Sequence, residues 1–289
     1  MNSSTPPTDC EVKTVTKNPK PGQEKSLQKE DFYVSNTRMT QSAHVLEQIL
    51  LQIRDLKQQG RRIQVVFDLD STLFDVSPRL QKILMDFANH PEYQQQFSQH
   101  LPLFQRIQTE KKDWGIRAAL IRAGYKEDHP DFHNTIRDFW VQHFFSNSYL
   151  HYDLPYAGAQ DYVNAVAQAG AEIVYLTGRD QERMAIGSEE VLKRWNFPLQ
   201  PPQSELALKP HKSMDDAEFK KDWFLLNREK NYDKIWFFEN EPVNIHLIDQ
   251  HCAEVDMIFL DTTHAGKAEA PLHLPTIVDF IYSSAGESK

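Results

Sequence analysis

The fold of this chain is decided by residues 63–75, which read Ile-Gln-Val-Val-Phe-Asp-Leu-Asp-Ser-Thr-Leu-Phe-Asp. Residues 65–67 form a short β-branched and aromatic run that is typical of a buried parallel strand. The run ends in two carboxylates, Asp68 and Asp70, and ligands of open α/β sheets bind at that end of the strands. Because residues two apart in an extended segment point to the same side, both carboxylates can face one ligand.

The next two residues supply hydrogen-bond donors. Ser71 and Thr72 offer hydroxyl and backbone N–H groups that suit an anion. A carboxylate pair beside such donors indicates a metal ion together with a phosphate group. The alternative is a strand that ends in a solvated turn, where Asp and Ser are common. Since three apolar residues followed by Asp-apolar-Asp-x-Thr arise by chance about once in several hundred such chains, the functional interpretation is favoured.

The composition is that of an ordinary soluble globular protein. The chain has 289 residues, 40% of them hydrophobic and 25% charged, which allows one large domain or a core with an insert. No run approaches the roughly 18 apolar residues of a membrane span, and the first residues are polar, so we expect neither a span nor a secretory signal. A net charge of −9 disfavours nucleic acid as a partner. With only Cys10 and Cys252 present, we expect no structural disulfide and a cytoplasmic setting.

The first half of the chain changes character twice. Residues 1–40 are rich in Ser, Thr, Pro, Lys and Glu and lack periodic apolar positions, which predicts a disordered N-terminal tail. From residue 41 on, apolar positions recur at steps of three and four, which predicts an amphipathic helix that ends near Gly60. Residues 76–154 then show helical spacing, with a helix from Ser77 and further helical stretches over 91–100, over 103–123 with a possible break near Gly115, and over 130–145.

Strands alternate with helices in the rest of the chain. Strand-like runs occur at residues 173–176, 205–208, 235–238 and 255–260, and helical segments at 161–169 and 216–229. This alternation predicts an α/β fold with a doubly wound parallel sheet and right-handed crossovers. We therefore predict an α/β core over residues 41–75 and 155–289, interrupted by an all-helical insert over residues 76–154.

At residues 63–75 the sequence resembles the haloacid dehalogenase (HAD) superfamily of phosphohydrolases, whose first motif is a strand followed by Asp-x-Asp-x-Thr/Val. The resemblance implies a HAD-like Rossmannoid core and makes the helical insert a cap that closes over the active site. It implies that Asp68 attacks phosphorus to give an aspartyl-phosphate, and that Asp70 protonates the leaving oxygen and then deprotonates the water. The dehalogenase branch of the superfamily lacks the second aspartate, so Asp70 argues against dehalogenation.

The resemblance also implies two phosphate-binding groups. Thr177, after the second core strand, matches the second motif, a Ser or Thr whose hydroxyl binds a phosphoryl oxygen, and Arg179 either braces that loop or takes part directly. The third motif is a lysine that neutralises charge on the phosphate and the nucleophile. Lys220 matches best, because it lies near a helix start 19 positions before Glu239. Lys209 is the alternative.

The fourth motif departs from the family. Members carry Asp-Asp, Gly-Asp or Glu-Asp at the end of the fourth strand, whereas this chain has Glu239-Asn240-Glu241. Alignment on Glu-Asp puts Asn240 where a metal-binding aspartate is expected, and Mg²⁺ accepts a neutral amide oxygen as a ligand. The implied magnesium site consists of Asp68, the backbone carbonyl of Asp70, Glu239 and Asn240. The alternative is that this loop is only a polar turn.

The sequence therefore predicts a HAD-like, magnesium-dependent phosphohydrolase that acts on a small phosphorylated substrate and has no membrane partner. One alternative is a non-catalytic HAD-like scaffold that binds a phosphate ligand or a protein partner, and another is a phosphatase of nucleotides or nucleic-acid ends. A negative chain without a basic tract makes a long nucleic acid the poorer choice. Neither the substrate nor the oligomeric state is decided. The aromatic and basic side chains of the insert, among them Trp114 and Trp140, are expected to form its core and its solvated face, and the alternative is that they form a substrate-binding site.

Overall fold

The computed structural model describes residues 21–283 of the chain. Its contacts divide the chain into two units, residues 1–37 and residues 38–289, and the sheet belongs to the second. Helix α1 has the bounds Pro21–Gln58. The prediction of a disordered tail over residues 1–40 is wrong from residue 21 on, because Glu, Lys, Gln and Leu favour a helix even where no apolar stripe recurs. Residues 1–20 lie outside the described residues.

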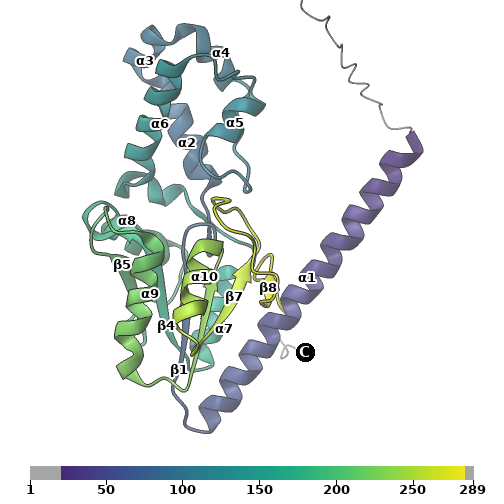
Figure 1. Cartoon of the computed structure of the whole chain (residues 1–289), viewed down its shortest axis with the longest axis vertical. Helices are drawn as coiled ribbons and strands as arrows, with labels where there is room; N and C mark the ends of the chain where they lie inside the picture. Colours follow the sequence, from purple (N-terminus) through teal and green to yellow (C-terminus); the bar gives the residue numbers. More distant parts are fainter. Residues whose placement is uncertain (1–20, 284–289) are drawn as a thin grey trace, which may run out of the picture. The chain divides into compact units, whose positions relative to one another are not determined.

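Six parallel strands form the central sheet of the second unit (Figure 1). In sheet order they are β5 (Ser204–Lys209), β4 (Glu172–Asp180), β1 (Ile63–Phe67), β6 (Lys234–Glu239), β7 (Val255–Leu260) and β8 (Thr276–Ile277). Every pair of neighbours is parallel, which confirms the doubly wound parallel sheet. The five predicted strands all lie within it. Of these six strands only β8 was not predicted, because a strand of two residues is too short to show the alternation of side chains that identifies a strand.

Helices cover both faces of the sheet, and β1 is buried between them. The helices that connect the strands are α7 (Ala159–Gln168), α8 (Gln181–Arg194), α9 (Asp216–Asn227) and α10 (Pro242–His251). Val65 and Phe67 pack in one apolar cluster with α1, α7 and α8, whereas Val66 packs in another with α9 and α10. Because alternate residues of a strand point to opposite faces, one unbroken apolar run serves both layers.

The insert between β1 and β4 is helical and is called the cap below. Its elements are α2 (Ser77–Asn89), α3 (Pro91–Gln96), α4 (Leu101–Phe104), α5 (Arg117–Arg122) and α6 (Pro130–Phe144), with 3-10 helices at Ser98–His100 and Asn147–Tyr152. It has an apolar core of its own, in which the Phe87 and Phe132 ring centres lie 6.0 Å apart. At its base the two ends of the insert meet as antiparallel strands, β2 (Phe74–Asp75) and β3 (Leu154–Pro155).

The cap helix predicted over residues 103–123 is wrong as a continuous helix, because only its two ends are helical and the interruption between them includes the possible break near Gly115. Residues 105–116 form an irregular segment between α4 and α5, within which Gly115 takes a left-handed conformation with φ +73°. Apolar spacing misled the prediction, because Ile107 and Ile116 reach the cap core from this segment without a helix between them. Within residues 21–283, no helix has both the length and the apolar composition that a membrane crossing requires.

The return from the cap to α7 depends on a glycine. Gly158 precedes α7 with φ +76°, and the adjacent Ala157 carbonyl accepts a hydrogen bond from the Phe280 backbone N–H at 2.9 Å. A Cβ at Gly158 would stand 2.4 Å from the Phe280 carbonyl oxygen. The close approach of two backbones therefore excludes a side chain at this position.

We expect Gly158→Ala to lower the free energy of unfolding by about 2–5 kcal/mol, since a left-handed alanine and an overlap with backbone both cost free energy. Gly266→Ala is the matched control, because Gly266 also has a positive φ, +67°, but nothing lies within 4 Å of an added Cβ. Urea denaturation of the two variants measures the difference. Equal losses would mean that the Phe280 backbone moves away at no cost.

Candidate active site

The carboxyl ends of three neighbouring strands bring predicted site residues together. Asp68 follows β1, Thr177 lies near the end of β4 and Glu239 ends β6, with β1 between the other two strands. The Asp68 backbone N–H donates to the Phe238 carbonyl at 3.0 Å, so the pairing of β1 with β6 continues into the site. Asp68, Thr177 and Glu239 are all buried. The edge of the sheet that binds ligands in open α/β folds is therefore where these groups lie.

Lys220 joins two of the carboxylates. It lies in the first half of α9, and its Nζ donates to Asp68 Oδ1 and to Glu239 Oε2 at 2.6 Å each. Burial raises the pKa of Asp68 to about 7, although the Lys220 ammonium opposes this rise, and the charge of Glu239 adds to it. Burial by itself would lower the pKa of Lys220, but the two carboxylates outweigh it and raise that pKa above its ordinary value. Lys220 therefore stays cationic at neutral pH.

The alternative lysine, Lys209, has a different partner. It ends β5, and its Nζ donates to Asp216 Oδ1 at 2.5 Å. Asp216 also packs closely on the turn after Thr177, because a Cβ at Gly178 would stand 2.5 Å from its Oδ2. The geometry favours Lys220 over Lys209 as the lysine beside the proposed nucleophile.

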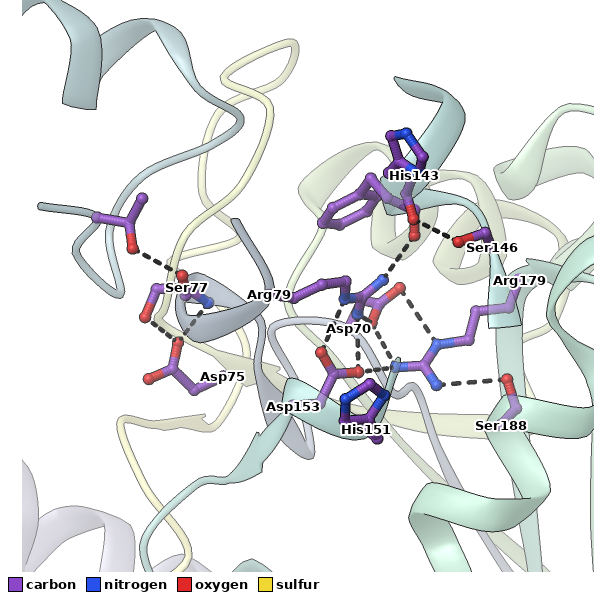
Figure 2. A network of polar contacts seen from close by, with 12 residues as sticks. Asp70, Asp75, Ser77, Arg79, His143, Ser146, His151, Asp153, Arg179 and Ser188 are labelled. Atoms are coloured by element: carbon purple, nitrogen blue, oxygen red, sulfur yellow. Dashed lines mark hydrogen bonds and ion pairs between the residues drawn. The ribbon is translucent and has the colours of Figure 1, made fainter. Parts of the chain in front are cut away.

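Asp70 is held by two arginines (Figure 2). Arg79 Nη2 and Arg179 Nη2 each donate to Asp70 Oδ1 at 2.6 Å, and Arg179 Nε lies 3.4 Å from Oδ2. Burial by itself would raise the pKa of Asp70, but Arg179 and Arg79 outweigh it and hold that pKa well below its ordinary value. Asp70 is therefore a carboxylate at neutral pH.

Asp153, next to β3, completes this cluster. Its carboxylate accepts hydrogen bonds from Arg79 Nε at 2.7 Å, from Arg79 Nη2 at 2.8 Å and from Arg179 Nη2 at 2.8 Å (Figure 2). Arg79, Asp153 and Arg179 are buried, and the Arg79 guanidinium lies 4.2 Å from the centre of the Phe144 ring. Because α2 supplies Arg79 and β4 supplies Arg179, this set of two cations and two anions ties the cap to the sheet.

Sequence reasoning missed Arg79 and Asp153. They are 74 positions apart, and neither belongs to a motif of the resemblance. The one available signal was a charged residue within an otherwise apolar surrounding, since Arg79 adjoins the buried Leu80 and Asp153 adjoins a segment rich in aromatic residues. A charge that is buried needs a partner, but the sequence does not say which one.

Thr177 can donate to an anion. Its Oγ1 accepts a hydrogen bond from the Arg179 backbone N–H at 3.2 Å, which leaves the hydroxyl proton for a ligand. Thr177 lines the same cavity as Asp68, Asp70 and Lys220. The structure thus brings the four residues predicted to be catalytic around one cavity.

The loop after Asp68 is tightly folded. The Ser71 backbone N–H donates to the Phe74 carbonyl at 2.8 Å, and the Phe74 N–H donates to the Leu69 carbonyl at 2.9 Å. Ser71 has φ +61°, a left-handed conformation that costs about 1–2 kcal/mol for a residue with a side chain. Strained backbone in a loop that lines a cavity is typical of functional sites.

Glu239 has no oxygen to spare. Its Oε1 accepts hydrogen bonds from the backbone N–H groups of Asn240 and Glu241 at 2.9 Å each. Its Oε2 accepts from Lys220 at 2.6 Å and from Asn244 Nδ2 at 3.0 Å. The four acceptor sites of the carboxylate are thus filled by protein donors.

The other two residues of the loop are less completely bonded. Asn240 Oδ1 accepts from the Thr72 hydroxyl at 3.0 Å, and its Nδ2 donates to the Thr263 carbonyl at 2.6 Å. Glu241 Oε2 accepts from the Ala265 backbone N–H at 2.8 Å. Its Oε1 is buried and has no hydrogen-bond partner within the described part of the chain.

A cavity of about 410 Å³ lies between this edge of the sheet and the cap. Among the described residues, seven carboxylates and three cationic side chains line it. The carboxylates are Asp68, Asp70, Asp113, Asp215, Asp216, Glu239 and Glu241, and the cations are Arg179, Lys220 and Lys267. A phosphate group would be repelled by this excess of negative charge unless a further cation were present.

A parallel α/β core with an aspartate pair after its central strand, and a helical insert directly behind that pair, defines a class of hydrolases. The sequence model described as haloacid dehalogenase-like hydrolase matches residues 64–192. The chain therefore contains a haloacid dehalogenase-like hydrolase domain. The matched segment includes Asp68, Asp70 and Thr177, whereas Lys220 and the loop at residues 239–241 lie beyond it.

Comparison with curated protein sequences gives no match. Among solved structures, the chain is similar to a haloacid dehalogenase-like family protein from Streptococcus pneumoniae, with 8% identity, a TM-score of 0.41 and coverage of 69% of this chain and 84% of that one. It is also similar to a predicted phosphatase from Clostridium acetobutylicum, with 12% identity, a TM-score of 0.41 and coverage of 70% and 85%. Similarities at this level carry no argument about activity.

We expect Asp153→Asn to lower the free energy of unfolding by about 3–5 kcal/mol, because it leaves two buried arginines with a single carboxylate. Glu189→Gln is the control, since Glu189 and Lys193 form an exposed pair at 3.0 Å whose loss should change stability little. Chemical denaturation measures both. If Asp153→Asn is no less stable than the control, the cluster does not hold the cap to the sheet.

Proposed function

We propose that this protein is a magnesium-dependent phosphohydrolase that cleaves a phosphomonoester through an aspartyl-phosphate on Asp68. The observation that carries the proposal is the position of Asp68 at the end of β1, with Oδ1 bound to the Lys220 ammonium at 2.6 Å. No donor among residues 21–283 reaches Oδ2 in the same way, and Asp68 lines the cavity. One oxygen is thus held in place and the other is free to attack.

The proposed reaction has two displacements at phosphorus. In the first, Asp68 Oδ2 forms a bond to phosphorus while the bond to the ester oxygen breaks, and the leaving oxygen takes a proton from a water molecule in the cavity. In the second, water attacks the same phosphorus and loses a proton to the solvent while the bond to Asp68 breaks, which releases phosphate and restores the carboxylate. Thr177 would donate to a phosphoryl oxygen, and Lys220 would keep the nucleophile ionised and offset the charge of the phosphate.

Asp70 suits one of its two predicted roles better than the other. Arg79 and Arg179 donate to its carboxylate and favour the ionised form. A carboxylate held in this way can accept a hydrogen bond from the attacking water and orient it. It is a poor proton donor, so we propose that the leaving oxygen takes its proton from a water molecule in the cavity.

The residues around the cavity fit a magnesium ion. The fit rests on Glu241 Oε1, since a buried carboxylate oxygen without a partner costs free energy that a bound cation would offset. The excess of carboxylates in the cavity points the same way. No three His, Cys, Asp or Glu side chains of the described residues converge on one point, so the site would need carbonyl and amide oxygens as well.

We propose that Asp68, the backbone carbonyl of Asp70, Asn240 and Glu241 hold the ion. Glu239, which the sequence also predicted as a ligand, would have to give up one of its four hydrogen bonds, and its position suits the task of holding Lys220. When bound, the ion would neutralise charge on the phosphate and hold it toward the nucleophile. A cavity of about 410 Å³ would admit a small phosphorylated molecule.

Asp68→Asn should abolish turnover, because it removes the nucleophile and keeps the shape of the side chain. The variant should be at least as stable as the wild type, because the Lys220 ammonium still pairs with Glu239 and the repulsion between the carboxylates of Asp68 and Glu239 is removed. Release of phosphate from a panel of small phosphomonoesters, with and without magnesium, measures activity, and a thermal melt measures stability. Asp138→Asn, on the cap surface, is the control and should retain full activity.

Activity of the Asp68→Asn variant at the wild-type level would refute the nucleophile. A wild-type protein that binds phosphate but hydrolyses no ester would support the alternative, a non-catalytic scaffold of the same fold.

A magnesium titration distinguishes the proposed ligands. Glu241→Gln should raise the magnesium concentration needed for half-maximal thermal stabilisation by about tenfold, which corresponds to the loss of about 1.4 kcal/mol of binding. Asn240→Asp should lower that concentration, because it restores a carboxylate. Glu269→Gln, in an exposed position, is the control. Melting temperature reports binding without relying on turnover, and coincident curves for all variants would place the ion elsewhere.

A further inference from the structure

The cap gives the cavity an apolar and aromatic wall. The cap side chains that line it are Val76, Leu80, Trp114, Trp140, Phe144 and Phe145, together with the carboxylate of Asp113. Both oxygens of Asp113 accept hydrogen bonds from Arg122, at 2.7 and 2.5 Å, so this carboxylate is already neutralised. Within the described residues, no lysine, arginine or histidine of the cap lines the cavity.

Trp114 is the unusual member of this wall. It belongs to the irregular segment at residues 105–116 rather than to a helix, and 56% of its surface is exposed. Neighbouring Gly115 lies against Trp140, because a Cβ at that glycine would stand 3.3 Å from the Trp140 ring. No aromatic ring among the described residues stacks on Trp114. A large exposed indole at the edge of a cavity is a surface that a planar ligand can cover.

The rest of the wall is fixed from behind. Trp140 and Phe144 are one turn apart on α6, with ring centres 5.7 Å apart, and Phe145 follows at 5.1 Å from Phe144. The Phe144 ring lies over the buried Arg79 guanidinium, which the cluster with Asp70 and Asp153 holds in place. These rings therefore offer a preformed surface rather than one that has to assemble around a ligand.

The charged side chains that line the cavity also limit which leaving groups it can bind. A second phosphate or a carboxylate on the leaving group would find no cap cation that lines this cavity, and it would face the carboxylates of Asp215 and Glu241 with Lys267 of the core as the one lysine beside them. A sugar would leave hydroxyl groups against apolar rings, where their hydrogen bonds to water are lost without replacement. An uncharged planar ring avoids both costs.

We propose that the substrate is the phosphate monoester of an aromatic alcohol, whose uncharged ring stacks on Trp114 and packs against Trp140 and Phe144 while its phosphate lies beside Asp68. This inference rests on the proposed function, because it names the substrate class of the same site. The cavity of about 410 Å³ leaves room for one or two rings in addition to the phosphate group.

The test compares two esters that differ in aromaticity alone. Benzyl phosphate and cyclohexylmethyl phosphate have similar size and similarly acidic leaving alcohols, so a difference between them reports on the ring. With the full-length protein and magnesium, kcat/KM should be about tenfold higher for benzyl phosphate than for cyclohexylmethyl phosphate, the size of effect that ring stacking supplies. Ribose 5-phosphate and a nucleoside 5′-monophosphate should be poorer still.

A variant assigns the preference to Trp114. Trp114→Leu should reduce kcat/KM for benzyl phosphate to near that for cyclohexylmethyl phosphate, mainly through KM. Because the side chain is largely exposed, the fold should persist in this variant. A melting temperature equal to that of the wild type would show that the cap is still held by the ion pair of Asp153 with Arg79. Leu272→Ala, at a position 90% exposed and away from the cavity, is the control and should keep the preference.

Calorimetry of ester binding to the Asp68→Asn variant keeps the inference testable without turnover. Tighter binding of benzyl phosphate than of cyclohexylmethyl phosphate, lost in the double variant with Trp114→Leu, would support it. Equal binding and equal kcat/KM for the two esters, or a preference for the sugar or nucleoside phosphate, would overturn the inference and leave the proposed function standing. If the wild type hydrolyses no ester, the proposed function fails, and the binding comparison still decides whether this wall recognises an aromatic ring.

Discussion

The ammonium group of Lys220 lies between two carboxylates that would otherwise repel each other inside the protein. Asp68 and Glu239 end neighbouring strands, and the lysine of α9 donates to both at 2.6 Å. Removing charges from water costs free energy, and only close pairing with good geometry offsets that cost. With Asp68 ionised, the trio carries one net negative charge, which would attract a further cation. The loop after β6, the start of α9 and the aspartate pair after β1 are arranged around this contact.

A second ionic cluster serves a different purpose. Asp70, Arg79, Asp153 and Arg179 carry two charges of each sign, so the set is balanced within itself and needs no ligand. One cluster is therefore left open to the cavity and the other is closed. Asp70 belongs to the closed cluster and also lines the cavity, which makes it the link between the position of the cap and the chemistry at Asp68.

The sequence predicted what depends on local pattern. The apolar run before Asp68 was sufficient to predict β1, and the alternation of strands and helices was sufficient to predict the parallel sheet. The spacing of 19 positions to Glu239 was sufficient to select Lys220 as the lysine nearest Asp68. It did not predict the partnership of Arg79 with Asp153, since a contact across 74 positions leaves no periodic trace. It also did not separate Glu239 from Glu241, because the difference lies in which hydrogen-bond donors surround each carboxylate. The irregular segment that carries Trp114 has helical spacing, so the sequence predicted no more than a possible break near Gly115, and the length of the segment depends on tertiary packing.

The two ends of the cap meet as a pair of two-residue strands, Phe74–Asp75 beside Leu154–Pro155. Because the two ends of the insert lie side by side, a different insert could replace it without changing the register of the sheet. Here the exchange carries a condition, because the inserted segment contributes Arg79 and Asp153 to a cluster that continues into the core. A replacement insert must supply a cation in place of Arg79 and an anion in place of Asp153, or Arg179 must be replaced at the same time. Substrate specificity can therefore change most easily through those parts of the insert that do not contact the Arg79–Asp153 cluster.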